Sequence, residues 1–335
     1  MSSTLDPARR AALVGAKLAS VVADAGRRSG APPSALGRGA AMVDDLGEAW
    51  VLIDEPCGRG LGGALAWAVR RECSAVHIVA EAAAVAGAGA MARRAGQLTM
   101  PVTVQHLDGR SRIDVIADPL PVPVRTPEPH RAFIAAIVAG GAVAVQENGV
   151  VSGEVAGLEV CRVVDDPVSG SPRLAVGIGA HDRELYQMLH GDRSPTESLA
   201  DVVRSVAAHR VPGAERHPLN LIAASRLLRS RLIADPRLVG LDTLVAGEPP
   251  VARTNLKDEV PCVAVDPTTA TVVVCVSGVD LDAVPYAGDV ISQHAAARCI
   301  IAAPDRDVLP IQQRLAELVT VPTRFAPIPS PAGAS

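Results

Sequence analysis

The chain has 335 residues, a formal net charge of −4 at pH 7, and six cysteines that form no C-x-x-C pair. This length allows two or three domains, and the acidic balance gives the whole molecule no general attraction for nucleic acid. The scattered cysteines argue against a disulfide framework or a zinc site. Because no apolar run reaches the ~18 residues that span a bilayer, we expect a cytoplasmic protein without membrane contact.

The N-terminal part, residues 1–30, is predicted to be a helix followed by a loop. Asp6-Pro7 is a favourable helix start, and residues 8–25 carry Ala, Leu and Val at helical spacing. The loop covers residues 26–39.

An α/β domain is predicted over residues 31–120. Short apolar strands alternate there with helical patterns: strands at 49–54, 75–81 and 101–107, and helices at 61–73 and 88–98. Because each crossover between strands passes through a helix, we expect the strands to be parallel. The proline-rich stretch 117–130 interrupts both helix and sheet and predicts a domain boundary.

A mixed α+β middle domain is predicted over residues 131–255. It begins with a helix at 130–142, continues through strands between Glu147 and Val164, and ends with helices at 195–210 and 220–233. Pro195, Thr196 and Glu197 give the first of these two helices a strong start.

A second α/β unit is predicted over residues 256–328, followed by a tail, 329–335. Its elements are strands at 271–277, 298–304 and 323–328 and helices at 282–295 and 307–319. The strand starts in both units are separated by steps of 25 or 26 residues. The fold class that follows is α/β, with two similar βαβαβ units flanking the middle domain. Their matching spacing suggests an internal duplication; the alternative is the regular repeat of strand and helix found in any α/β protein.

The C-terminal run contains the stretch "CVAVDPTTATVVVCVS", which has the shape of a strand hairpin, and "IIAAPD", which has the shape of a later strand ending in a proline-containing loop. In this arrangement the run resembles the PD-(D/E)XK nuclease-like fold. Cys275 and Ser277 stand where the family has an acid and a lysine, and Pro261 stands near its first aspartate, with Asp258 and Glu259 close by. The resemblance implies a nuclease-like core without catalysis.

The N-terminal unit shares this resemblance more distantly. "WVLIDEP" supplies Asp54, but Pro56 occupies the position of the lysine. Nuclease chemistry requires clustered carboxylates for Mg²⁺ and a lysine or equivalent that orients the attacking water. The resemblance therefore implies that both copies are degenerate.

The densest set of possible hard-metal ligands lies in the middle domain. It comprises Glu147, Glu154, Glu159 and Asp182. Glu154 and Glu159 would face opposite sides of a straight strand, but a bulge or turn at Gly153 and Gly157 would bring them together. The set indicates either an Mg²⁺ or Mn²⁺ site, with Glu154 and Glu159 as ligands, or structural sheet carboxylates in ion pairs.

The glycines of "GRGLGG" match a dinucleotide-binding fingerprint. Gly58, Gly60 and Gly63 lie between a strand and a helix, and Glu81 ends the next strand. In that fingerprint the backbone approaches a pyrophosphate at a helix N-terminus. Four residues separate the strand from the first glycine, so the alternative interpretation is a flexible strand–helix loop.

An arginine-rich segment offers a site for phosphate groups. The segment from Asp201 to Gly240 contains seven arginines and three acidic residues, which gives it a local charge of +4. Arg226, Arg229 and Arg231 are the candidate phosphate ligands, because arginine binds phosphate bidentately. The alternative is a solvated helix face paired with nearby acids.

The leading hypothesis is a non-catalytic nuclease-like protein that contacts nucleic acid or a partner in DNA metabolism or regulation. Three alternatives stay open: a Mg²⁺-dependent nuclease or phosphodiesterase centred on the middle-domain glutamates, a nucleotide-binding sensor at the glycine motif, and a scaffold that binds protein or forms a homodimer. Whether the chain is an enzyme is left open by its sequence.

Overall fold

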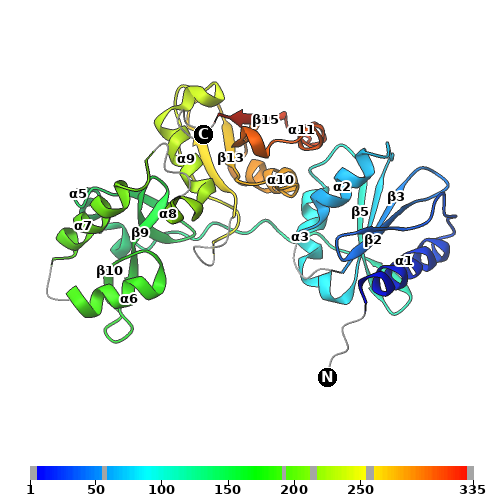
Figure 1. Cartoon of the computed structure of the whole chain (residues 1–335), viewed down its shortest axis with the longest axis horizontal. Helices are drawn as coiled ribbons and strands as arrows, with labels where there is room; N and C mark the ends of the chain where they lie inside the picture. The colour runs from blue at the N-terminus through cyan, green and yellow to red at the C-terminus, as the bar shows by residue number, and fades with distance from the viewer. Residues whose placement is uncertain (1–5, 55–58, 191–193, 212–216, 254–259, 330–335) are drawn as a thin grey trace. The chain divides into compact units, whose positions relative to one another are not determined.

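The computed structural model describes residues 6–54, 59–190, 194–211, 217–253 and 260–329. They form an α/β protein with three sheets, as the sequence predicts (Figure 1). The chain divides into two compact units. Unit 1 comprises Met1–Leu120, Asp280–Ser292 and Leu309–Phe325, and unit 2 comprises Pro121–Val279, Gln293–Val308 and Ala326–Ser335. The division between Leu120 and Pro121 falls inside the proline-rich stretch.

Unit 1 contains a six-stranded sheet with the order β1-β2-β3-β4-β5-β6. Its strands are β1 (Ser34–Leu36), β2 (Gly39–Val43), β3 (Ala49–Ile53), β4 (Val76–Ala80), β5 (Val102–Asp108) and β6 (Ser111–Asp114). The central strands β3, β4 and β5 are parallel, and the outer ones pair antiparallel. The parallel arrangement follows from the crossover helices between these strands.

Helices cover both faces of this sheet (Figure 1). They are α1 (Pro7–Asp24), α2 (Leu61–Val69), the 3₁₀ turn η1 (Ala82–Ala84) and α3 (Val85–Ala95). On α1, Leu18 and Val22 are buried against Trp50 and Leu52 of β3. Burial of such side chains contributes about 1.5–3 kcal/mol each.

Segments from far along the chain complete unit 1. Helix α11 (Pro310–Ala316) contacts α2, and Thr320 N–H donates to Gln97 O. In α10 (Ala283–His294), the buried Asp289 accepts hydrogen bonds from Arg93 and Arg94 of α3.

Unit 2 contains a four-stranded antiparallel sheet with the order β10-β9-β8-β7. Its strands are β7 (Val143–Glu147), β8 (Val150–Val155), β9 (Leu158–Asp165) and β10 (Pro172–Val176). The accompanying helices are α4 (Glu128–Arg131), α5 (Ile134–Ala139), α6 (Gly179–His190), α7 (Pro195–Ala207) and α8 (Pro218–Leu221). Ile137 of α5 and Leu199 of α7 are fully buried against the sheet's apolar residues.

Unit 2 also contains most of a five-stranded sheet with the order β11-β12-β13-β14-β15, and the first three residues of β15 are counted with unit 1. Its strands are β11 (Val245–Gly247), β12 (Cys262–Asp266), β13 (Thr271–Cys275), β14 (Arg298–Pro304) and β15 (Thr323–Ile328). Strands β11 to β13 are antiparallel, and β13 pairs parallel with β14. Helix α9 (Ala224–Ala234) packs Leu228 and Leu232 onto this sheet. The short 3₁₀ turns η2 (Pro236–Val239) and η3 (Asp305–Asp307) connect its elements.

Three predicted elements differ from the structure. Part of the predicted loop 26–39 forms β1, which pairs with β2. The single helix predicted over 130–142 is instead α4 and α5, and the helix predicted over 220–233 is split into α8 and α9. The second split occurs where Ala223 has a φ of +53°, which a right-handed helix excludes. The internal duplication stays a prediction.

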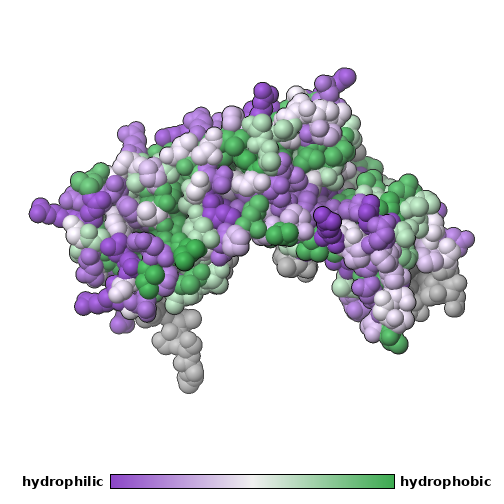
Figure 2. Space-filling model, turned by 180° about the vertical axis from the view of Figure 1, so that it is seen from behind, coloured by the Kyte–Doolittle hydropathy of each residue, from purple (hydrophilic) through white to green (hydrophobic). Residues whose placement is uncertain are grey.

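The surface mixes apolar and polar side chains. Ile116 and Val122 are exposed, and the face drawn in Figure 2 intersperses hydrophobic with hydrophilic residues, as is usual for folded proteins. Among the described helices, none combines the length and the apolar character needed to cross a lipid bilayer.

Candidate functional site

The β8–β9 hairpin brings two of the predicted acidic residues together. Glu154 pairs directly with Glu159 across the hairpin, with a bulge between Gly153 and Glu154. The turn contains Gly157 at a φ of +78°. The predicted bulge and turn at these two glycines are therefore confirmed.

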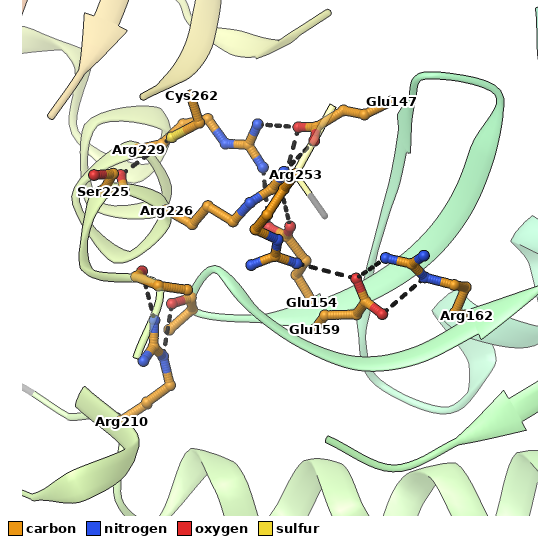
Figure 3. Close-up of polar contacts among 12 residues, drawn as sticks. Glu147, Glu154, Glu159, Arg162, Arg210, Ser225, Arg226, Arg229, Arg253 and Cys262 are labelled. Atoms are coloured by element: carbon orange, nitrogen blue, oxygen red, sulfur yellow. Dashed lines mark hydrogen bonds and ion pairs between the residues drawn. The ribbon is translucent and has the colours of Figure 1, made fainter. Parts of the chain in front are cut away.

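The same turn packs closely onto helix α9. A Cβ atom on Gly157 would lie 2.2 Å from the carbonyl oxygen of Arg226. Arg210 strengthens the contact, because its guanidinium donates to the carbonyl oxygens of Ala156 in the turn and of Ala223 just before α9 (Figure 3). The backbone of the hairpin turn therefore lies in close contact with the backbone of α9, and the charged side chains of the two elements lie opposite each other.

One half of the resulting cluster is a ring of four buried charges. Arg226 and Arg229 of α9 each donate to both Glu147, at the end of β7, and Glu154 of β8 (Figure 3). The Nη2 atom of Arg229 lies 3.1 Å from Glu154 Oε2, and the Arg229 side chain is only 2% exposed. The candidate metal ligands and the candidate phosphate ligands are therefore each other's partners.

The other half of the cluster surrounds Glu159. Its carboxylate accepts hydrogen bonds from Arg162 of β9 at 2.9 and 3.0 Å, from Arg183 of α6 at 3.0 Å and from Arg253 at 3.1 Å. We call the whole set the Arg–Glu cluster; its members are Glu147, Glu154, Glu159, Arg162, Arg183, Arg226, Arg229 and Arg253. All six carboxylate oxygens of its glutamates accept hydrogen bonds from guanidinium groups.

The arginines determine the ionisation of the cluster. Burial raises the pKa of the Glu147 carboxyl, but the charges of Arg229 and Arg226 outweigh this and hold the pKa below its ordinary value. Burial likewise raises the pKa of Glu159, and its hydrogen bonds and charge pairing with Arg162, aided by Arg253, lower it further than burial raises it. Both carboxylates are therefore ionised at neutral pH.

Positive charge exceeds negative charge in the cluster. The set holds five arginines and three glutamates, a formal surplus of two positive charges. Outside the set, Asp182 is near enough to raise the pKa of Arg183, and Glu248 is near enough to feel the charge of Glu147. The surplus positive charge affects Arg253, because burial and the charge of Arg226 both lower the pKa of its guanidinium. Its side chain is 8% exposed, and among the residues that the structure describes its buried Nη1 atom has no hydrogen-bond partner. A buried donor left without a partner costs about 1–3 kcal/mol.

Asp182, the fourth of the predicted metal ligands, accepts a hydrogen bond from the neighbouring backbone and is not among the glutamates' hydrogen-bond partners. It lies in the first turn of α6, where its Oδ2 accepts the N–H of Ile178 at 2.6 Å. In the part of the chain that the structure describes, no group of three or more His, Cys, Asp or Glu side chains is arranged to hold a metal ion. The predicted Mg²⁺ or Mn²⁺ site thus has no preformed ligand set among these residues.

Arg231 is directed elsewhere. Its Nη1 donates to the carbonyl oxygen of Pro329 at 2.6 Å, which ties α9 to the chain just after β15. Of the three arginines proposed as phosphate ligands, two belong to the ring and the third contacts the backbone. The sequence analysis did not single out Arg162, Arg183 or Arg253, and no local pattern marks them.

The glycine motif occupies the start of α2 in unit 1. Gly58 lies outside the described residues. The N–H groups of Gly60 and Gly62 donate to the carboxylate of Asp282 at 2.9–3.2 Å. The helix N-terminus, where a pyrophosphate was expected, therefore holds an anion of the chain itself.

Close packing explains one glycine of this motif. A Cβ atom on Gly62 would lie 2.2 Å from the carbonyl oxygen of Leu281, whereas one on Gly63 would meet nothing within 4 Å. The glycine that packing requires is thus Gly62, which the fingerprint does not include.

Comparison of the chain with protein-family models, with curated proteins and with solved structures found no match. The nuclease-like resemblance stays a prediction drawn from the pattern of strands and helices.

Proposed function

We propose that this chain is a non-catalytic protein that contacts the phosphate groups of nucleic acid through the arginines around Glu159. The nuclease-like pattern of its sequence and the arginine-rich segment motivate this choice. The charge surplus of the Arg–Glu cluster is the observation that carries it.

A phosphate group would satisfy what the cluster leaves unmatched. Arg253 carries a buried donor without a partner in the described part of the chain, and Arg162, which shares the Glu159 carboxylate with it, is 32% exposed, so an anion from solvent can contact the set at Arg162. Guanidinium groups bind phosphate oxygens through paired, charge-assisted hydrogen bonds. Such a ligand would offset the formal surplus of positive charge and satisfy the orphaned donor together.

Two chemical features argue against metal-dependent nuclease catalysis by this chain. A metal ion at the glutamates would have to displace arginines from all six carboxylate oxygens. In the hairpin of β12 and β13, Cys275 and Ser277 replace the acid and the lysine that nuclease chemistry requires.

Recognition would be independent of base sequence. Aromatic residues make up only 2% of the chain, so few side chains are available to stack on bases. Contacts limited to phosphates position a protein on nucleic acid without reading its sequence.

The experiment is a fluorescence-anisotropy titration of the full chain with labelled single- and double-stranded DNA and RNA over a salt series. We expect affinity to fall as salt rises. Arg253→Gln should weaken binding and lower the salt slope by about one. Urea unfolding of the same variant separates lost binding from lost folding, and we expect it to stay folded because Glu159 keeps two other arginines.

Arg131→Gln is the matched control. Arg131 is 52% exposed and pairs with Glu128 on the surface of α4 in the same unit, so its loss should leave the affinity nearly unchanged. Absence of salt-dependent binding would refute the proposal. Cleavage that requires Mn²⁺ and disappears in Glu159→Gln would refute its non-catalytic part.

A further inference from the structure

Two of the buried cysteines form a pair. Cys262 of β12 and Cys275 of β13 are directly opposed in the antiparallel ladder, so both side chains project from the same face of the sheet. The two thiols are close enough to influence each other's ionisation. Both lie in the apolar core under α9.

The backbone positions suit a disulfide. Directly opposed residues of an antiparallel pair have Cα atoms about 4.5 or 5.5 Å apart. Both separations lie within the range of about 4.4–6.8 Å that a disulfide spans. Bond formation between Cys262 and Cys275 therefore requires side-chain rotation and little movement of the strands.

The surroundings of Cys262 favour its thiolate. Its sulfur lies beside Arg229 of the Arg–Glu cluster, whose positive charge favours the thiolate, whereas in the thiol form Cys262 Sγ–H donates a hydrogen bond to the carbonyl oxygen of Ser225 at 3.2 Å (Figure 3). Burial raises the pKa of this thiol, but the hydrogen bond from Cys275 and the charge of Arg229 bring the pKa below its ordinary value. The pKa of Cys275 is raised by its hydrogen bond to Cys262 and by burial. One thiol is thus prepared to attack and the other to resolve.

We infer that Cys262 and Cys275 are a redox-active pair that a small peroxide converts to a disulfide. The Cys262 thiolate attacks one peroxide oxygen, the O–O bond breaks, and the departing hydroxide takes up a proton as water. The Cys275 sulfur then attacks the sulfenic acid at Cys262, the S–O bond breaks, and a second water leaves with the Cys275 proton. One hydrogen peroxide is reduced to two waters, and two thiols are oxidised.

Cys161 provides a comparison within the same chain. It is equally buried, but Gly153 and Val176 lie opposite it on the neighbouring strands. Burial raises the pKa of Cys161 to about 12. It therefore has neither a resolving cysteine opposite it nor a stabilised thiolate, and it should remain a thiol.

Oxidation of the pair would change the contacts of α9. To bond with Cys275, the sulfur of Cys262 gives up its contact with Ser225 and its place beside Arg229. The link between the five-stranded sheet and the Arg–Glu cluster is then altered. The inference does not depend on nucleic-acid binding and goes beyond the proposed function.

The test is peptide mapping by mass spectrometry of the folded full chain after hydrogen peroxide treatment and alkylation. We expect a peptide that links Cys262 to Cys275 with the loss of two hydrogen atoms, and an alkylated Cys161. In Cys275→Ser, dimedone should trap a sulfenic acid at Cys262. In Cys262→Ser, dimedone should leave Cys275 unlabelled.

Three results would overturn the inference. They are the absence of the linked peptide from the folded protein, its appearance only in urea, and dimedone labelling of Cys275 in Cys262→Ser as strong as that of Cys262 in Cys275→Ser. Circular dichroism of both serine variants checks that each is folded before treatment.

Discussion

Glu154→Gln tests whether the Arg–Glu cluster holds unit 2 together. The substitution keeps the shape of the side chain and removes one negative charge from the buried ring. Arg226 and Arg229 then share Glu147 alone. Because the Arg229 side chain is 2% exposed, solvent cannot replace the missing charge.

The expected loss follows from this burial. Breaking a buried ion pair by removing one partner costs about 3–5 kcal/mol. Glutamine retains one carbonyl oxygen that can still accept a hydrogen bond, so the loss should lie near the lower limit, about 3 kcal/mol. For a domain of 150–250 residues this corresponds to a fall in melting temperature of roughly 6–12 °C.

The assay is urea and thermal unfolding by circular dichroism, combined with hydrogen exchange. Amides of β8, β9 and α9 should lose protection, while those of β3 and β4 in unit 1 should keep it. Glu128→Gln is the control, since Glu128 is 82% exposed and its pair with Arg131 should contribute less than about 1 kcal/mol. A loss below about 1 kcal/mol for Glu154→Gln, or equal losses in both variants, would refute the reasoning.

Three further predictions use matched pairs or pH. Gly157→Ala should cost at least about 2 kcal/mol in urea unfolding, because it adds a clash with α9 to a positive φ, whereas Gly170→Ala, with a similar φ of +68° and open space, should cost about 1 kcal/mol. Gly62→Ala should destabilise unit 1 in thermal unfolding, whereas Gly63→Ala should be neutral or stabilising by up to about 1 kcal/mol. The cluster's lowered glutamate pKa values mean that its stabilisation is complete above about pH 4.3 and is lost as the pH falls through the folded-state values. Acid titration of the unfolding free energy should show this loss, and a rise in stability on acidification would contradict it.

The sequence predicted the parallel core of unit 1 because its pattern is local. The five residues of β3 are all buried, and their continuous apolar run is typical of a parallel strand covered on both faces. Strand β2 was missed because "GAAMV" is short and rich in alanine, a composition that does not distinguish a strand from a loop. Strand β6 was missed because its residues are polar and mostly exposed at the edge of the sheet.

The candidate site was predicted in its parts and missed as a whole. The glutamates and the arginines were both recognised as unusual concentrations of charge, but they were assigned to different ligands. Glu154 and Arg226 are 72 residues apart in the sequence, and no local sequence pattern predicts that two segments so far apart are in contact. Arg253 carried no signal at all, because its importance comes from an unmatched donor that only the packed structure defines.

The discontinuity of unit 1 has a consequence for its synthesis. Asp282, which caps α2, is 220 residues from Gly62, and Asp289, which binds Arg93, comes later still. At about 5–20 residues per second on a ribosome, roughly 8–35 s pass between translation of the last strand of the six-stranded sheet and translation of these residues. During that interval the start of α2 has only water for its amide groups and α11 is absent from its flank. Unit 1 is therefore completed only after residues 280–325 have been translated, and a nascent chain stalled at residue 279 should expose α2 and α3 to chaperones.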